Sequence, residues 1–299
     1  MRPNVVIERL KGLATGRLHH YAFQRIFRDQ PVREWIANRV AKARPSASAD
    51  RLTDVEIGEV KRLANDGFIS LPGLITTEQI FEIKEYLRDK LCYNRNRPLQ
   101  GDRFLPDQPP LGTHVAAYSD ADTVNCPHVL QLANDERVLR LVGGYFKCRP
   151  TISNLSLWWS LKTDEAPEEA ENFHRDIDDW RQLKLFIYLT DVDDDLGPHV
   201  FVRESHRIRQ SLDTRRYSDE EVISGFGAGR IVTFTGPMGT CFLENTFGLH
   251  KGKTARGGNR LLLQVLYTLN PLGVSEYNPI DRADATAVVD RYINRLYIL

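Results

Sequence analysis

The chain has 299 residues, of which 41% are hydrophobic and 27% charged, and its 40 basic side chains are balanced by 40 acidic ones. This composition is typical of a globular protein with one large domain, and the zero net charge gives no reason to expect a nucleic-acid partner. The sequence contains no apolar run of about eighteen residues and no N-terminal apolar segment of the secretory type. It therefore predicts neither a membrane-spanning helix nor a secretory signal.

The four cysteines lie far apart and form no C-x-x-C pair, which argues against a zinc cage. Without a secretory signal, we expect free thiols in a reducing compartment, and hence a cytoplasmic protein. Nothing in the sequence indicates an oligomeric state.

Residues 1–45 form a basic segment with ten Lys or Arg residues and three acids. Apolar residues recur at a spacing that predicts amphipathic helices, namely Val6, Leu10 and Leu13, then Phe23, Ile26 and Phe27. Two interpretations stay open: a helical extension that packs on the domain or on a second subunit, which we favour, or helices on an anionic membrane surface. Residues 45–50 read as a linker, so we divide the chain into an extension, residues 1–50, and a main domain, residues 51–299.

Helices and a short strand are predicted at the start of the main domain. Thr53 or Asp54 can begin a helix over 53–66, and Thr76 or Thr77 can begin another. Between the two helices, residues 68–71 read as a strand.

Residues 92–125 are rich in Pro, Gly, Asn and Asp, which predicts a long connection with little regular structure. Such a connection is either a lid over a functional site or a solvated loop. As a lid, it would bring Arg95, Arg97 and Arg103 to an anionic substrate. A further helix is predicted at 127–144.

From residue 150 onward, segments rich in β-branched and aromatic residues are separated by turn signals. Strands are predicted near 151–161, 183–190, 199–203, 229–235, 240–246 and 260–269, and a closing helix at 282–296. This pattern predicts a mainly β fold with flanking helices, in which two sheets form a barrel or jelly roll.

His174 and Asp176 are the first candidate site residues. On an extended segment, residues i and i+2 point the same way, so both side chains can reach one metal ion. His250, which closely follows an apolar strand, fits as the third ligand. Two imidazoles and one carboxylate leave coordination positions open, as in non-haem Fe(II) oxygenases, although zinc accepts the same ligands.

Arg260 favours iron over zinc. It begins the apolar strand that continues with Leu261, so its charge needs an anionic partner inside or at the mouth of the barrel. A guanidinium binds a carboxylate with two parallel hydrogen bonds, as the anchor of an organic-acid co-substrate would. Arg256 is the rival anchor, but it lies in a Gly-rich turn where solvent exposure is expected.

From about residue 53 to 270, the chain resembles the phytanoyl-CoA dioxygenase family of Fe(II)/2-oxoglutarate-dependent oxygenases. The motifs that carry the resemblance are Asn65-Asp66-Gly67-Phe68-Ile69-Ser70-Leu71-Pro72-Gly73-Leu74 with Thr77-Glu78, the helix from Pro127 to Gly143, Phe173-His174-Arg175-Asp176, Leu189-Thr190-Asp191-Val192, Gly197-Pro198-His199-Val200-Phe201-Val202 with Ser205-His206, His250-Lys251-Gly252, and Arg260. The chain departs from the family at Arg203-Glu204, where Pro-Gly usually precedes Ser-His. This departure alters a turn and does not touch the candidate metal ligands.

The resemblance implies a double-stranded β-helix, the cupin-like jelly roll, with Fe(II) held by His174, Asp176 and His250. It implies that Arg260 binds the distal carboxylate of 2-oxoglutarate and that Phe186 lines the same pocket. It also implies a dioxygenase that consumes dioxygen and 2-oxoglutarate to hydroxylate a small molecule, a sugar or a lipid-linked compound. Halogenating relatives replace the carboxylate ligand with a small residue, so Asp176 favours hydroxylation or another oxidation.

Two alternatives stay open beside the oxygenase. One is a zinc-bearing β-barrel without oxygenase activity. The other is a membrane-surface protein that acts through residues 1–45. The substrate is not identified by the sequence, although an anionic or lipid-linked small molecule would suit the basic residues.

Overall fold

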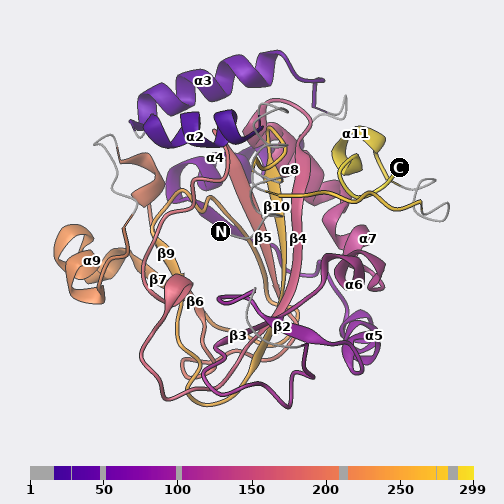
Figure 1. Cartoon of the computed structure of the whole chain (residues 1–299). Helices are drawn as coiled ribbons and strands as arrows, with labels where there is room; N and C mark the ends of the chain where they lie inside the picture. Colours follow the sequence, from indigo (N-terminus) through magenta and orange to yellow (C-terminus); the bar gives the residue numbers. More distant parts are fainter. Residues whose placement is uncertain are drawn as a thin grey trace.

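The computed structural model describes residues 17–27, 29–47, 52–98, 103–208, 215–273, 275–281 and 289–299. Two antiparallel sheets form its centre (Figure 1). The larger sheet has the order β1-β8-β5-β10-β4-β3-β2 and the smaller sheet has the order β7-β6-β9. The strands are β1 Phe68–Ser70, β2 Cys92–Asn94, β3 Val115–Tyr118, β4 Thr151–Ser160, β5 Gln182–Tyr188, β6 His199–Val202, β7 Ile231–Phe234, β8 Cys241–Glu244, β9 His250–Gly252 and β10 Arg260–Thr268.

Helices surround the sheets. They are α2 Arg17–Ile26, α3 Gln30–Lys42, α4 Asp54–Asp66, α5 Thr77–Leu87, α6 Asp120–Asn125, α7 Val129–Ala133, α8 Glu136–Phe146, α9 Asp219–Phe226 and α11 Arg291–Asn294, with short 3-10 turns at Glu169–Glu171, Ser205–Arg207 and Ala228–Arg230. Figure 1 shows the smaller sheet and α9 on one side of the long strands β4, β5 and β10, and α5, α6 and α7 on the other. None of the helices in the described ranges is long and apolar enough to cross a membrane.

The strand β10 separates the core from the interior of the barrel. Its nine residues are all buried, and alternate side chains point to opposite faces. Leu261 and Leu263 belong to the main hydrophobic core, which also contains Leu141 of α8. Arg260 and Leu262 instead line a cavity between the sheets. One face of this strand therefore packs in the hydrophobic core, and the other face lines the cavity.

Two helix starts follow the predicted capping chemistry. Thr53 accepts a hydrogen bond from the backbone N–H of Glu56, whose side chain accepts one from the backbone of Thr53 in return. Thr76 caps α5 in the same way with Gln79. The helix α4 ends at Gly67, which has a positive φ of 94°.

The predicted helix over 127–144 is wrong as a single element. Asp135 accepts a hydrogen bond from the backbone N–H of Val138 and so begins a new helix, α8, after α7 has ended at Ala133. An Asp side chain competes for backbone donors in this way and favours a cap over a helix interior.

The prediction of little regular structure over 92–125 is confirmed only in part: the described residues between β2 and β3 form no helix or strand, but the ends of the segment contribute β2, β3 and α6. The strand β9 was not predicted either. These strands have three or four residues each, too few to show an alternating pattern. At the C-terminus, α11 is shorter than the predicted helix, and residues 282–288 lie outside the described residues.

The helices α2 and α3 pack against the main body through a buried cation. Arg33 donates hydrogen bonds to the carbonyl oxygens of Gln24, at 2.8 Å, and Asp179, at 2.7 Å. Its guanidinium also lies over the rings of Trp180 and Phe247. For the described part of residues 1–45, this contact agrees with the interpretation that the N-terminal extension packs on the main domain. The predicted positions Val6, Leu10 and Leu13 lie outside it, and the domain boundary near residue 50 stays a prediction.

Candidate metal centre and its cavity

The structure brings His174, Asp176 and His250 together, with one potential ligand atom of each within 4.8 Å of the others. The His250 Nε2 atom is 3.2 Å from Asp176 Oδ2, and the His174 Nε2 atom is 3.6 Å from Asp176 Oδ1. Two ligand atoms at adjacent corners of a metal shell, each about 2.1 Å from the ion, are about 3 Å apart. The three side chains therefore fit one metal ion.

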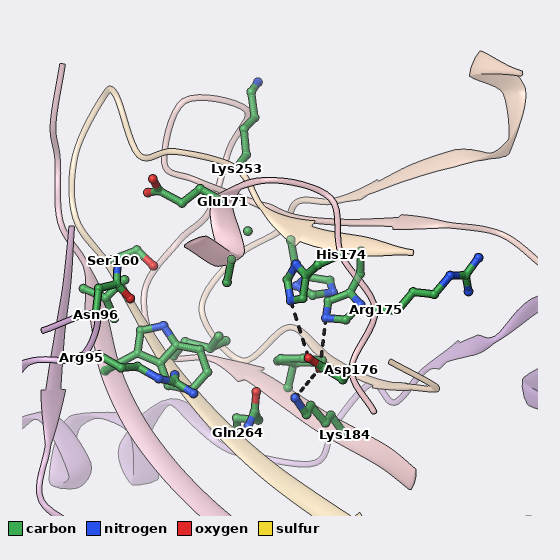
Figure 2. A pocket seen from close by; sticks show the side chains of 18 of the residues that line it. Arg95, Asn96, Ser160, Glu171, His174, Arg175, Asp176, Lys184, Lys253 and Gln264 are labelled. Atoms are coloured by element: carbon green, nitrogen blue, oxygen red, sulfur yellow. Dashed lines mark hydrogen bonds and ion pairs between the residues drawn. The ribbon is translucent and has the colours of Figure 1, made fainter. Parts of the chain in front are cut away.

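Backbone pairing holds the three residues in place. The extended segment that contains His174 pairs antiparallel with the start of β9, through two hydrogen bonds of 2.9 and 3.0 Å between His174 and His250. The backbone N–H of Asp176 donates to the carbonyl of Thr246 at 2.9 Å. The i and i+2 alternation predicted from the sequence is thus present, and Arg175 points away from the cluster (Figure 2) to donate to Phe247 O.

Both imidazoles have their tautomers fixed by backbone carbonyls. The Nδ1 atom of His174 lies 2.9 Å from the carbonyl oxygen of Asn172, and that of His250 lies 2.9 Å from that of Gly248. A carbonyl oxygen only accepts, so each Nδ1 carries the hydrogen. In the neutral rings the lone pairs then reside on the two Nε2 atoms, which face Asp176, as a metal site requires.

Lys184 on β5 is part of the cluster and was not predicted. Its Nζ lies 2.6 Å from Asp176 Oδ2 and 3.5 Å from Asp178 Oδ2, and Figure 2 shows it beside the carboxylate of Asp176. The strand alternation that turns Phe186 inward also turns Lys184 inward, so the signal was present in the sequence.

The protonation states of the three candidate ligands favour the binding of a metal cation. Burial and the neighbouring His250 lower the pKa of His174 to about 3, so this ring is neutral. Burial alone would raise the pKa of Asp176, but Lys184 and His250 hold it well below its usual range. Burial would lower the pKa of His250, but Asp176 raises it above the ordinary value. The cluster thus presents a carboxylate to an ion, and His250 must release any proton it holds.

A cavity of about 510 Å³ adjoins the cluster, and both Arg260 and Phe186 line it, where they were predicted. The Arg260 guanidinium donates to Ser160 Oγ at 2.9 Å and to the carbonyl of Gly197. Its Nε is buried and has no partner among the described residues. The rival Arg256 donates to the carbonyl of Thr163 and does not line the cavity.

His199 and Glu244 form a buried pair in the same interior. His199 lines the cavity and has Nε2 2.9 Å from a Glu244 carboxylate oxygen. Burial raises the pKa of Glu244 to about 8. His206 donates from Nε2 to the carbonyl of Ala64 at 3.0 Å and His128 pairs with Glu82, so both lie outside the cluster.

The segment 92–125 reaches the cavity through Arg95 and Asn96. Arg97 instead lies 3.5 Å from a carboxylate oxygen of Glu168, and Arg103 lies over the ring of Tyr93. Of the three arginines predicted to meet an anionic substrate, only Arg95 lines the cavity.

Neither a model of a known protein family nor a curated protein matches the sequence. Solved structures do match. EctD from S. alaskensis, with bound Fe, is 16% identical with a TM-score of 0.55, and the match covers 85% of this chain and 92% of EctD. HygX from Streptomyces hygroscopicus, with nickel, 2-oxoglutarate and hygromycin B bound, is 17% identical with a TM-score of 0.52, and the match covers 81% and 97%.

The epimerase SnoN, in complex with Fe3+, alpha ketoglutarate and nogalamycin RO, is 17% identical with a TM-score of 0.51. The match covers 71% of this chain and 83% of SnoN. Together with the two antiparallel sheets and their flanking helices, these likenesses confirm the predicted fold class. The fold is a double-stranded β-helix.

Proposed function

We propose that the protein is an Fe(II)- and 2-oxoglutarate-dependent oxidoreductase that hydroxylates a small molecule, in the manner of the phytanoyl-CoA dioxygenase family. The observation that carries the proposal is the convergence of the His174 and His250 Nε2 atoms on Asp176 beside a buried arginine, Arg260. The solved structures with this fold carry iron, or nickel with 2-oxoglutarate, which supports the same ligands here.

In this proposal His174, Asp176 and His250 hold Fe(II). Arg260, with its spare Nε donor and its partner Ser160, would hold the distal carboxylate of 2-oxoglutarate. Bound iron and 2-oxoglutarate supply the reactivity, in which dioxygen is consumed and 2-oxoglutarate leaves as succinate and carbon dioxide.

The residues of the chain orient the reactants and exclude water. Phe186, Trp158 and Leu262 form an apolar wall of the cavity, which limits water at the reacting centre. Lys184 fixes one oxygen of Asp176. No protein acid or base is required in this scheme, because the oxidation needs a positioned substrate and not a protein proton donor.

Arg260 also favours an iron site with an organic-acid co-substrate over a zinc site. A hydrolytic or structural zinc site needs no buried guanidinium at the far end of its cavity. A guanidinium that is 3% exposed needs an anion, and a dicarboxylate that also chelates the metal provides one. This favours the oxygenase over the zinc barrel.

The experiment that tests the function is a titration of 2-oxoglutarate into anaerobic, Fe(II)-loaded protein, followed by its visible absorption band and by succinate release in air. Arg260→Gln should weaken 2-oxoglutarate binding about tenfold or more, because it removes a charge-assisted pair. Arg256→Gln is the matched control and should bind normally. Folded, iron-loaded wild-type protein that binds no 2-oxoglutarate would exclude the proposal, and zinc in the purified protein would favour the barrel.

Analysis of the product would identify the type of oxidation. Asp176 supplies the carboxylate that halogenating relatives lack, so we propose a product without halogen. Because SnoN is described as an epimerase, the mass of the product distinguishes hydroxylation, which adds one oxygen atom, from epimerisation, which adds none.

Exposed apolar side chains on α2 and α3 favour a second, compatible role at an anionic membrane surface. Phe23 is 49% exposed, Ile26 72% and Trp35 61%, within a segment rich in basic residues. Replacing all three with Ser should abolish co-sedimentation with anionic vesicles, whereas Leu111→Ser, at a residue 99% exposed elsewhere, should not. Vesicle binding that is absent from the wild type, or unchanged in the triple variant, would remove this role.

A further inference from the structure

The cavity beside the candidate metal centre carries an excess of positive charge. Eight basic and three acidic residues line it, namely Arg25, Arg95, Arg175, Lys184, Arg215, Arg216, Lys253 and Arg260 against Glu171, Asp176 and Asp178, although the guanidinium of Arg175 points away from the metal ligands. A metal ion would add further positive charge, which a dianionic co-substrate would offset. The excess that is left indicates that a further anion binds in the cavity.

Most of these cations already have partners. Arg175 donates to two backbone carbonyls, and Lys253 donates to one. Arg215 pairs with Glu221 at 2.6 Å, and Arg216 pairs with Glu169 at 2.9 Å. Such pairs leave these side chains little capacity to bind a ligand.

Arg95 is different, because its guanidinium makes no hydrogen bond or ion pair within the part of the chain that the structure describes. Its contact is with the ring of Trp158, whose centroid lies 4.5 Å from the guanidinium carbon. Figure 2 shows Arg95 reaching into the cavity, whose lining also includes Asn96, Ser160 and Gln264. A guanidinium stacked on an indole keeps its donor edge open and its plane fixed.

The backbone that carries Arg95 is held in place. Its N–H donates to the carbonyl of Val115 at 3.0 Å, which continues the pairing of β2 with β3. The side chain of Asn94 accepts from the backbone N–H groups of Asn96, at 3.1 Å, and Arg97, at 3.3 Å. Arg95 is therefore positioned before any ligand binds, which reduces the entropic cost of binding.

The charge of Arg95 is not balanced by its surroundings. Arg95 is exposed and lines the cavity, and among the described residues no ion pair joins it to the cavity carboxylates Glu171, Asp176 and Asp178. Asp176 and Asp178 instead pair with Lys184. An anion bound at Arg95 would therefore balance a charge that no carboxylate of the cavity pairs with.

We propose that Arg95, stacked on Trp158, binds a carboxylate, sulfate or phosphate group of the substrate. Gln264 lines the same cavity, and its amide nitrogen is directed at Asn154 Oδ1, at 3.5 Å, so Arg95 is the donor to which the anion is assigned. The inference rests on the proposed function, because it takes the cavity as the substrate site and reserves Arg260 for 2-oxoglutarate. The substrate is then an organic oxyanion, held at one end while another part faces the metal.

Inorganic phosphate is the probe for this subsite. Full-length protein, loaded with Ni(II) and saturated with 2-oxoglutarate, is titrated with phosphate in a calorimeter. The wild type should bind one phosphate per chain at millimolar concentrations. Arg95→Gln should weaken this binding about tenfold or more. Arg97→Gln, two positions along the same segment, is the matched control and should bind as the wild type does.

The 2-oxoglutarate affinity of each variant gives the second readout, and thermal unfolding shows whether each variant is folded. Unchanged phosphate binding in Arg95→Gln, or no binding by the wild type, overturns the proposal. A matching loss of 2-oxoglutarate affinity also overturns it, because Arg95 would then serve the co-substrate. If the protein binds phosphate through Arg95 but does not bind 2-oxoglutarate, the anion site is supported and the proposed oxygenase function is excluded.

Discussion

Lys184 controls the carboxylate at the centre of the site. Its ammonium lies between Asp176 and Asp178, at 2.6 and 3.5 Å from their nearer oxygens. Two carboxylates in one buried place repel each other, and burial disfavours the charge of both. Burial raises the pKa of Asp178 despite the lysine, whereas the pKa of Asp176 stays well below its usual range. The lysine therefore keeps Asp176 ionised for a metal ion.

Lys184→Met should weaken binding of Ni(II) or Fe(II) by about tenfold, which is typical of the loss of a group that orients a ligand. Metal titration of the folded apoprotein measures the effect. Lys253→Met is the control, because this lysine also lines the cavity but donates to the carbonyl of Asp194. Equal losses in both variants would mean that only the overall charge of the cavity matters.

His250 gives metal binding a pH dependence. Its pKa is raised by Asp176, so Nε2 holds a proton at pH values where an ordinary histidine is already neutral. A metal ion must displace that proton, so affinity should fall as the pH drops through the pKa of His250. His174, with a pKa of about 3, contributes nothing over this range. Calorimetry of Ni(II) binding in two buffers should detect a proton release that grows as the pH is lowered from neutral. A metal affinity that does not change between mildly acidic and neutral pH would contradict this assignment.

Two residues with positive φ lie close together where the end of α4 contacts the turn after β6. Gly67 has φ 94°, and a Cβ atom there would lie 2.6 Å from the ring of Phe201, so only glycine fits. Glu204 has φ 65°, a strained value for a residue with a side chain. Its backbone N–H donates to the carbonyl of Asp66 at 3.0 Å. This is the turn where the resemblance predicts glycine and the chain has glutamate.

Glu204→Gly should stabilise the protein by about 0.5–1 kcal/mol, because relief of the left-handed strain exceeds the extra freedom of glycine in the unfolded chain. Glu204→Ala is the matched control, since it keeps the Cβ atom and gives up the 3.5 Å contact with Arg230. Urea unfolding measures both. A gain in the alanine variant would mean that the glutamate charge, and not its backbone, is unfavourable.

The elements that the sequence predicted are those with long patterns or clear caps. β4, β5 and β10 have seven to ten residues each, and their alternation was readable. The spacing of His174 and Asp176 also predicted two side chains on one face. Arg95 could not be placed in this way, because its role depends on which strands become neighbours. The alternation of β5 did place Lys184 on the inner face with Phe186, but only the fold shows that this face meets Asp176. That information comes from pairing between distant segments, such as β2 with β3 and β5 with β10.

At the scale of the whole molecule, Asp179 joins three distant parts of the chain. It lies between the candidate ligand Asp176 and β5, and it is 2% exposed. Its backbone carbonyl accepts from Arg33 of α3 at 2.7 Å. Its carboxylate accepts from the backbone N–H of Asn270, after β10, at 2.7 Å and from the Asn270 amide at 2.9 Å. The N-terminal helices and the segment after β10 thus hold the loop that carries a ligand.

Asp179→Ala should therefore affect both stability and the metal site. The loss of a buried charged acceptor should lower the free energy of unfolding by about 2–3 kcal/mol. Metal affinity should also fall by about tenfold, because the loop that positions Asp176 loses its contacts with Asn270 and keeps the backbone contact with Arg33. Urea unfolding and Ni(II) titration of the folded fraction measure the two effects separately.

Asp191→Ala is the control for this prediction. Asp191 also accepts a backbone hydrogen bond, from Met238 at 2.8 Å, but it does so in an exposed turn away from the candidate ligands. It should leave metal affinity unchanged. If Asp179→Ala lowers stability and leaves metal affinity intact, the contacts of Asp179 support the fold alone. The geometry of the ligands would then come from the pairing of His174 with His250.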